Sequence, residues 1–450
     1  MSDSISSLRD RVKDRSALLG VIGLGYVGLP AACMFASAGF RVHGVDIDAG
    51  RAELIDSGRS PIEGDEPGLA ELLEQVVASH RLSAGSVHTD LADADVVLIC
   101  VDTPVDADHR PRFKALRAAC SQLGSVLKDG ALVIVESTIA PGTIDNVVRP
   151  ALEDSSGRHA GVGFHLGHCP ERVMPGKLLR NMRTMSRVCG GSSAEVADVM
   201  VALYSTFVEG DLDAADCLTA ELVKTAENAY RDVGIAFANQ LALICERVGG
   251  DAWLVRQLVN KVPGRDVLLP GGGVGGHCIP KDSWLLAAPL GEEAEDSLLA
   301  VARRINDSMP AHVAELVGDL VGRGKQGRVA VLGYAYLENS DDTRNSPSAE
   351  TIRLLSERGF DVAVHDPFVS EHKGDVMEVL RNADCAVLMV AHRAYRDLDL
   401  KRAADVMRKR ALVDARGFFG VEALRQAGFD YRFIGVGSTA ATYEEAPGPK

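Results

Sequence analysis

The sequence predicts an α/β protein made of two similar parallel-sheet halves with a long helix between them. Short apolar runs recur along the first 135 residues, and helical or loop segments separate them. A related pattern returns from Val329 onward. Between the two patterns, residues 215–248 contain no proline and are rich in helix-forming residues.

The expected strands of the first half are 18–22, 41–45, 96–101 and 132–135. Gly23, Gly25 and Gly28 follow the first strand at once, and Pro30 suits the first turn of a helix. Asp46 ends the second strand, eighteen residues past Gly28. This order of strand, glycine turn, helix, strand and acid is typical of a Rossmann dinucleotide-binding unit. A glycine turn that binds no ligand does not need the acid.

Each residue of this turn has a physical task. Gly23 makes the tight turn, Gly25 lets backbone N–H groups approach a pyrophosphate, and Gly28 lets helix and strand pack closely. A carboxylate at Asp46 accepts the ribose hydroxyls and repels a 2′-phosphate, so NAD is expected and not NADP. Arg51 either stacks on the adenine or is solvated, and the pattern leaves both open.

In the second half, strands are expected at 329–332 and 362–365, with a helix near 348–358. Residues 382–390 echo 93–101, so the third strand recurs too. The proline-free helix between the halves would be about 50 Å long at 1.5 Å per residue. Because one small domain does not need such a helix, it is expected to span the halves or to build a dimer interface.

Bulk composition excludes several classes of protein. Forty-eight basic and sixty-three acidic residues give a charge of −15, which argues against nucleic-acid or anionic-membrane partners. No apolar run reaches about 18 residues, which a membrane-spanning helix needs, and charged residues stand among the first twenty, where a signal peptide has an apolar stretch. A cytoplasmic protein is therefore expected. Nine cysteines occur singly without CxxC pairs, so neither a metal site nor a disulfide framework is expected, and most should be small buried side chains.

Two segments carry candidate chemistry. Lys224, Asn228 and Arg231 share one helix face, although such a stripe by itself is more often a solvated face. Residues 270–282 place five glycines in six positions before Cys278, a costly loop that indicates close backbone approach. His277 and Lys281 flank the cysteine, where they either favour a thiolate or merely bond to the backbone and face solvent.

Six motifs resemble the UDP-glucose/GDP-mannose dehydrogenase family and occur in the family's order over nearly the whole chain. They are GLGYVGLP at 23–30, ESTIAPGT at 136–143, CPERVMPGK at 169–177, residues 224–231, GVGGHCIPKD at 273–282 and DDTRNSPS at 341–348. The resemblance implies an NAD-binding Rossmann domain over 1–212, a central helical dimerisation region with the cysteine loop over 213–315, and a Rossmann-like UDP-sugar-binding domain over 316–450. It also implies a homodimer or a larger homo-oligomer.

The activity implied is a four-electron, NAD-dependent oxidation of a UDP-sugar C6 hydroxymethyl to a carboxylate, through a thiohemiacetal and a thioester on Cys278. Such products are associated with polysaccharide biosynthesis. In family terms Lys224, Asn228 and Asp282 surround the reacting carbon, and Glu171 or Thr138 positions the hydrolytic water. NAD contacts fall on Gly23, Gly25, Tyr26, Val27, Gly28, Asp46, Arg51, Thr103 and Thr138. Substrate contacts fall on Arg172, Val173, Lys224, Asn228, Arg231, Gly275, Arg344 and Arg416, and the last of these comes either from the same chain or from a partner subunit.

The sugar is indicated less directly. CPERVMPGK and GVGGHCIP resemble members that act on UDP-N-acetylhexosamines, above all the mannosamine type, with UDP-glucose as the second choice. Leu337 stands where many relatives have lysine, and the segment around Val262 lacks a histidine that some relatives have. Two other classes remain: a two-electron hydroxyacid dehydrogenase, which does not need Cys278, and a non-catalytic NAD-binding module, which needs neither Cys278 nor Lys224.

Overall fold

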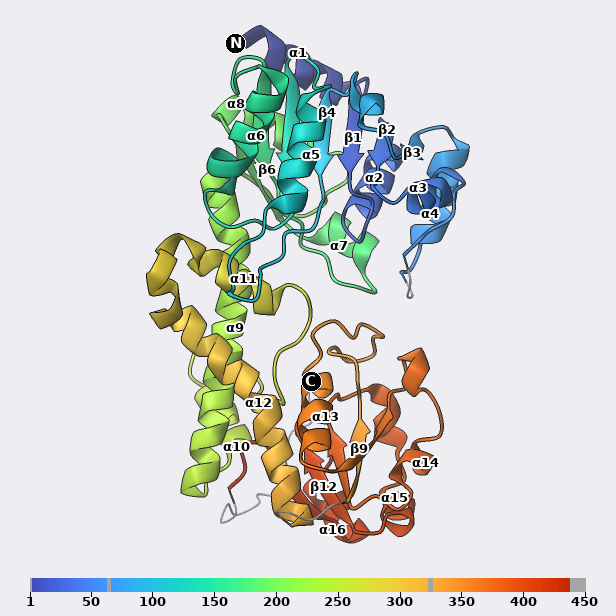
Figure 1. Ribbon diagram of the computed structural model, residues 1–450, viewed down its shortest axis with the longest axis vertical. Coiled ribbons are helices and arrows are strands. Elements are labelled where there is room, and N and C mark those ends of the chain that lie inside the picture. Colours follow the sequence, from blue (N-terminus) through green and yellow to red (C-terminus); the bar gives the residue numbers. More distant parts are fainter. Residues whose placement is uncertain (1, 63–65, 323–326, 438–450) are drawn as a thin grey trace. The chain divides into compact units, whose positions relative to one another are not determined.

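A computed structural model describes residues 2–62, 66–322 and 327–437 (Figure 1). The chain forms two compact units, Met1–Glu227 with Trp284–Gly291, and Asn228–Ser283 with Glu292–Lys450. The predicted division at residues 212/213 and 315/316 stays a proposal. None of the described helices is long and apolar enough to cross a membrane.

The first unit contains an eight-stranded sheet in the order β3-β2-β1-β4-β5-β6-β7-β8, parallel except between β6 and β7. Its strands are β1 (Leu18–Ile22), β2 (Arg41–Val45), β3 (Leu82–Gly85), β4 (Val96–Ile99), β5 (Ala131–Val135), β6 (Phe164–His168), β7 (Arg187–Gly191) and β8 (Leu212–Asp216). The chain leaves β1 toward β2 and β3 and returns on the other side to β4, so ligands are expected at the carboxyl ends of β1 and β4.

Helices cover both faces of this sheet, which explains why β4 and β5 are apolar at every position. One core lies under α1 (Ser2–Lys13), α2 (Gly28–Ser37), α4 (Leu69–Ala78) and α8 (Ala194–Tyr204), and the other under α5 (Lys114–Gly124) and α6 (Arg149–Ser156). The shorter helices of this unit are α3 (Ala49–Asp56) and α7 (Leu178–Thr184).

The second unit contains a five-stranded parallel sheet in the order β10-β9-β11-β12-β13. Its strands are β9 (Arg328–Leu332), β10 (Asp361–His365), β11 (Cys385–Leu388), β12 (Ala411–Asp414) and β13 (Asp430–Phe433). One face packs on α9 (Cys217–Val248), α12 (Leu298–Val321) and α13 (Pro347–Glu357), and the other on α14 (Val376–Leu380), α15 (Leu400–Val406) and α16 (Val421–Ala427). The remaining helices are α10 (Ala252–Val259) and α11 (Ile279–Ala287).

The predicted pair of Rossmann-like halves and the long helix are confirmed. Helix α9, the long helix drawn in green in Figure 1, has 32 residues and ends before Gly249, whose φ is +81°. It begins two residues later than predicted because Ala215 and Asp216 extend β8 and pair with β7. The strand predicted over 96–101 ends at Ile99.

A buried ion pair ties two strands of the first sheet together near their ends. Glu136, directly after β5, accepts hydrogen bonds from Tyr204 Oη at 2.5 Å and from Arg187 Nη1, on β7, at 3.4 Å. Burial raises the pKa of Glu136, and the Arg187 guanidinium opposes that rise. The side chains of both partners are almost completely inaccessible.

Replacing Arg187 by methionine tests how much the first unit depends on this pair. Arg187→Met keeps apolar volume but leaves the Glu136 carboxylate buried without its cation, so the free energy of unfolding should fall by about 3–5 kcal/mol in urea titrations. Arg187→Met/Glu136→Gln, which removes both charges, should recover a large part of the loss. A single variant as stable as wild type would show that the pair is not needed.

Candidate active site

The turn between β1 and α2 is shaped by glycines for two different reasons. Gly23 has φ +89°, and an added Cβ there would lie 2.4 Å from the carbonyl oxygen of Cys100. A Cβ at Gly28 would lie 1.8 Å from the carbonyl oxygen of Gly23. A Cβ at Gly25 would meet no atom of the described residues within 4 Å. The fold itself therefore requires Gly23 and Gly28, whereas the open side of the turn at Gly25 is suited to a ligand.

Asp46 lies at the end of β2 beside this turn and is 3% exposed. Its Oδ2 accepts from Leu24 N at 2.8 Å and from Arg51 Nη1 at 3.3 Å, and its Oδ1 accepts from Asp48 N at 2.9 Å. Arg51 therefore pairs with Asp46, while its side chain remains 41% exposed. Nothing in the turn caps α2 with a side chain, since Val27 occupies the N-cap.

These features fit NAD. The uncapped start of α2 offers backbone N–H groups to a pyrophosphate, the space at Gly25 allows the approach, and Asp46 stands where a ribose binds. Tyr26 and Val27 lie in the turn itself, and Tyr26 is partly exposed. Thr103 and Thr138, after β4 and β5, are both buried, and Thr103 Oγ1 donates to the carbonyl oxygen of Thr138 at 2.5 Å.

The second sheet has a similar glycine turn, but the aspartate beside it has more hydrogen-bond partners within the fold than Asp46 has. Gly333 follows β9 with φ +94°, and Asp366 follows β10 as Asp46 follows β2. The Asp366 carboxylate accepts from His392 Nε2 at 3.0 Å and from the backbone N–H groups of Tyr334, Ala335, Phe368 and Val369. Although burial alone raises it, these donors hold the pKa of Asp366 below its usual range. Asp366 is saturated within the fold, so it closes a turn instead of receiving a ribose.

In the first unit, Lys224 and Glu171 form a buried pair. Lys224 Nζ lies 3.8 Å from Glu171 Oε1, and Val173 N donates to Glu171 Oε2 at 2.5 Å. Both charged side chains are less than a tenth exposed. The solvated-face interpretation of the helix stripe is therefore wrong for Lys224. Arg231, two turns later on α9, is exposed.

Two residues near this pair, His168 and Arg172, make contacts within the protein that the sequence did not predict. His168 is fully buried at the end of β6 and donates from Nδ1 to the carbonyl oxygen of Val135 at 2.8 Å. Burial lowers its pKa to about 4, so it is a neutral group that the sequence did not single out. The Arg172 guanidinium pairs with Glu227 and donates to the carbonyl oxygen of Ser186 at 2.5 Å.

In the second unit, Cys278 stands immediately before α11. Its carbonyl oxygen accepts from Lys281 N at 3.0 Å and from Asp282 N at 2.8 Å, so Cys278 is the residue at the N-terminus of a nine-residue helix. A helix N-terminus favours a thiolate. Of the nine cysteines only Cys278 and Cys100 are not fully buried, and desolvation raises the pKa of the Cys100 thiol. Cys278 is the cysteine suited to nucleophilic chemistry.

Asn228 and Asp282 are brought together next to this thiol in the chain. Asn228 Nδ2 donates to Asp282 Oδ2 at 2.6 Å. Asp282 is fully buried, and its Oδ1 accepts no hydrogen bond from the described residues, with the Lys281 ammonium at 3.5 Å. A buried carboxylate oxygen in this state is suited to a water or a reacting hydroxyl as donor. Lys281 is itself buried, so its solvent-facing interpretation is wrong.

Residues from the C-terminal part of the same chain lie close to the glycines before Cys278. A Cβ at Gly271 would lie 2.8 Å from Arg416 Nη1, and one at Gly275 would lie 2.6 Å from Tyr336 Cβ. Gly276 N donates to the carbonyl oxygen of Arg344 at 3.0 Å. Arg416 therefore reaches the loop from the same chain, and no partner subunit is needed for that contact.

The side chains of the two arginines have carboxylate partners. Arg344 makes a bidentate pair with Asp342, and Arg416 Nη2 lies 3.2 Å from Glu338 Oε1. Leu337, between Tyr336 and Glu338, is partly exposed and brings no charge.

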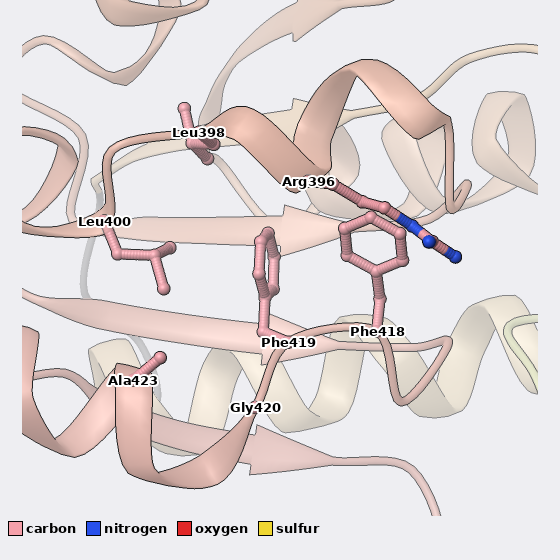
Figure 2. Close-up of a pocket in the computed structure, with 7 residues that line it drawn as sticks. All are labelled: Arg396, Leu398, Leu400, Phe418, Phe419, Gly420 and Ala423. Atoms are coloured by element: carbon pink, nitrogen blue, oxygen red, sulfur yellow. The ribbon is translucent and has the colours of Figure 1, made fainter. Parts of the chain in front are cut away.

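Described residues of the second unit line at least two cavities. One of about 540 Å³ borders the cysteine loop at Val274 and is also lined by Asn306, Asn345 and Pro347. The other, of about 320 Å³, is lined by Arg396, Leu398, Leu400, Phe418, Phe419, Gly420 and Ala423 (Figure 2). The Arg396 guanidinium lies 6.0 Å from the centre of the Phe418 ring, and no residue predicted for the site lines this second cavity.

Comparison with known proteins agrees with this architecture. The profiles of the UDP-glucose/GDP-mannose dehydrogenase family match as NAD binding domain over residues 17–208, central domain over 218–308 and UDP binding domain over 330–421. A UDP-N-acetyl-D-mannosamine dehydrogenase from Pyrococcus horikoshii is 37% identical, covering 93% of this chain and 99% of its own.

Two solved structures show the same fold over almost the whole chain. The NDP-N-acetyl-D-galactosaminuronic acid dehydrogenase from Methanosarcina mazei superposes with a TM-score of 0.85 at 36% identity, covering 97% of this chain and 98% of its own. A UDP-glucose dehydrogenase from Pyrobaculum islandicum gives 0.81 at 30% identity, with 93% and 98% covered. The chain belongs to the UDP-glucose/GDP-mannose dehydrogenase family of NAD-dependent oxidoreductases.

Proposed function

We propose that this enzyme oxidises the C6 hydroxymethyl group of a UDP-N-acetylhexosamine to a carboxylate, with Cys278 as nucleophile. The observation that carries the proposal is the partly exposed Cys278 at the N-terminus of α11, followed one turn later by Asp282 in its bond with Asn228. A two-electron hydroxyacid dehydrogenase or a binding module has no use for that thiol.

The first oxidation converts the hydroxymethyl group to an aldehyde. A base near Lys224 and Asp282, acting through a water, takes the hydroxyl proton as a hydride leaves C6. Bound NAD supplies the hydride acceptor. The Cys278 thiolate then adds to C6, while Lys224 and Asn228 stabilise the oxyanion of the thiohemiacetal.

Loss of a second hydride from C6, for which a second NAD would be the acceptor, leaves a thioester on Cys278. A water held by Glu171 or Thr138 attacks the thioester, and the C–S bond breaks to return the thiol. Overall one CH2OH group and one water give up two hydrides and three protons and become a carboxylate. Each placed donor contributes on the order of 3 kcal/mol to the transition state.

Three parts of the chain have separate tasks in this proposal. Residues 1–212 bind NAD, 213–315 carry the cysteine loop, and 316–450 bind the UDP-sugar. Further contacts to the sugar nucleotide come from all three parts, at Arg172, Val173, Arg231, Arg344 and Arg416. The buried carboxylate of Asp46 beside the glycine turn disfavours a 2′-phosphate, in keeping with NAD.

The choice of an N-acetylated sugar rests on the motifs and on the relatives. The Pyrococcus and Methanosarcina proteins are named for N-acetylated sugars, and the UDP-glucose dehydrogenase from Pyrobaculum is less similar in both identity and TM-score. UDP-glucose therefore stays the second candidate.

A substrate panel tests the sugar. We expect kcat/KM, measured by NADH formation, to be at least about tenfold higher with UDP-N-acetylmannosamine or another UDP-N-acetylhexosamine than with UDP-glucose, as a filled acetyl pocket contributes about 1.4 kcal/mol or more. GDP-mannose serves as the control for the nucleotide. Faster turnover of UDP-glucose would replace the first candidate by the second.

We also propose that the chain forms a homodimer through α9. Tyr230, Phe237 and Ile244 follow one another at seven-residue spacing in the second unit and are 81%, 59% and 49% exposed in the single chain. Large apolar side chains repeated along one helix face are typical of a helix-to-helix interface between identical subunits. The second copy of the chain would cover this stripe.

A charge placed in the stripe should separate the subunits. Phe237→Asp should elute with the light-scattering mass of one chain, whereas wild type elutes with that of two or more, because a buried carboxylate opposes the interface. Val87→Asp changes an exposed apolar residue outside the stripe and should keep the wild-type mass. An unchanged mass in Phe237→Asp would exclude α9 as the interface.

Replacement of the thiol tests the chemistry. Wild type should yield two NADH per sugar, and Cys278→Ser should lose several orders of magnitude in turnover, because a serine hydroxyl is a poor nucleophile and a poor leaving group. NAD binding, followed by calorimetry, should stay unchanged since the glycine turn is intact. Cys245→Ser, at a buried cysteine of α9, is the control. Two NADH per sugar from Cys278→Ser at near-normal rate would reject the thioester mechanism.

A further inference from the structure

A buried hydrogen-bond network surrounds Asp232 on α9, one turn after Asn228. Asp232 Oδ1 accepts from Arg303 Nη1 and from Asn306 Nδ2, both on α12 and both at 2.7 Å. Asp232 Oδ2 accepts from Ser283 Oγ, on α11, at 2.8 Å. Asp232, Asn306 and Ser283 are fully buried, and Arg303 is 2% exposed. The carboxylate thus joins three helices of the second unit.

The network continues to the start of the cysteine loop. Asn306 Oδ1 accepts from Asn239 Nδ2 at 2.9 Å, and Asn239 Oδ1 accepts from Gly271 N at 2.9 Å. Asn239, like Asn306, is fully buried. One connected set of side chains therefore holds Gly271 at one end of the loop and Ser283 at the other.

Cys278 lies between these two fixed points. Six residues lie between it and Gly271 and four between it and Ser283, and most positions on the Gly271 side are glycines. A glycine segment tied at only one end retains large conformational entropy, whereas two ties restrict it strongly. Ser283 also follows Asp282 directly. The hydrogen bond of Ser283 to Asp232 therefore restricts the position of the Asp282 carboxylate, which accepts from Asn228.

We propose that Asp232, Asn306 and Asn239 form a clamp that positions Cys278 by fixing both ends of its loop. The proposal rests on the proposed role of Cys278 as nucleophile. These are positioning residues, since they act through Gly271 and Ser283. A buried charge of this kind is costly unless every partner is kept, and such networks select one arrangement of a segment more than they add stability.

Asp232→Asn tests the clamp with a side chain of the same shape. The neutral amide removes the negative charge that faces the Arg303 guanidinium. If its nitrogen faces Arg303 and Asn306, both of their bonds are lost, and if it faces Ser283, that bond is reversed because a hydroxyl can also accept. We expect kcat to fall about 10- to 100-fold with KM for the UDP-sugar within about threefold, the cost of a nucleophile misplaced by about 1 Å. The midpoint of the pH profile of iodoacetamide alkylation, followed on the Cys278 peptide by mass spectrometry, should rise as the thiol leaves its place at the helix N-terminus.

Asp384→Asn is the matched control. Asp384 is a buried aspartate of the same unit that pairs with Arg408 and receives Arg328 N at the amino ends of the strands. It should lower stability and leave both the alkylation profile of Cys278 and kcat as in wild type. If Asp232→Asn does not fold, Ser283→Ala removes one hydroxyl only and should shift the same profile.

A double-variant cycle separates a clamp from two local effects. Asn239→Ala frees the Gly271 end, and Asp232→Asn frees the Ser283 end. If the two act through one network, the fall in kcat of the double variant is smaller than the product of the single falls. Falls that multiply, or wild-type alkylation profiles in Asp232→Asn and Asn239→Ala, would overturn the clamp. These profiles do not depend on turnover, so an active Cys278→Ser would reject the proposed function without deciding the clamp.

Discussion

Buried and half-buried polar side chains along α9 form hydrogen bonds and ion pairs with the loops that carry the candidate site residues. Along α9, Glu221 accepts from Gly142 N and Ile144 N, Lys224 pairs with Glu171, and Asn228 bonds to Asp282. Further along, Asp232 and Asn239 hold the segment that contains Cys278. An unpaired buried polar group costs about 1–3 kcal/mol, so each of these contacts selects one position of the loop it meets. Within each unit, this helix therefore holds motifs that are far apart in the sequence.

The two sheets share a glycine turn and an aspartate, but the two aspartates differ in their hydrogen-bond partners. Both have a glycine turn after the first strand and an aspartate after the second. Asp46 accepts three donors at the side of an open turn, while Asp366 accepts five and is closed by His392. Asp366 has two more backbone amides than Asp46, and His392 takes the place of Arg51 as side-chain donor. The first turn is therefore the one suited to a cofactor.

Much of the architecture could be predicted from local pattern. Strands β1 and β2 have the predicted bounds. β1 is a continuous apolar run that ends at a glycine turn, and β2 alternates polar with apolar residues until it ends at Asp46. Helix α9 was predicted within two residues, because proline is absent and Gly249 stops it. The thiol at Cys278 was found because a run of glycines before one cysteine has no simpler explanation. The helix stripe was harder: the spacing pointed to Arg231, which is exposed, and passed over Asp232, which is buried.

Local sequence pattern is sufficient to predict the α/β class, the two Rossmann-like halves, the long helix, the dinucleotide turn at Gly23 to Asp46, and the candidate nucleophile, since each depends on residues close together in the chain. Contacts between distant segments are needed to establish that Lys224 and Lys281 are buried, that Arg416 and Arg344 meet the glycine loop within one chain, and that Gly271 and Ser283 are held by one network. Burial and hydrogen-bond partners depend on which segments meet across tens or hundreds of residues, and residue spacing does not encode that.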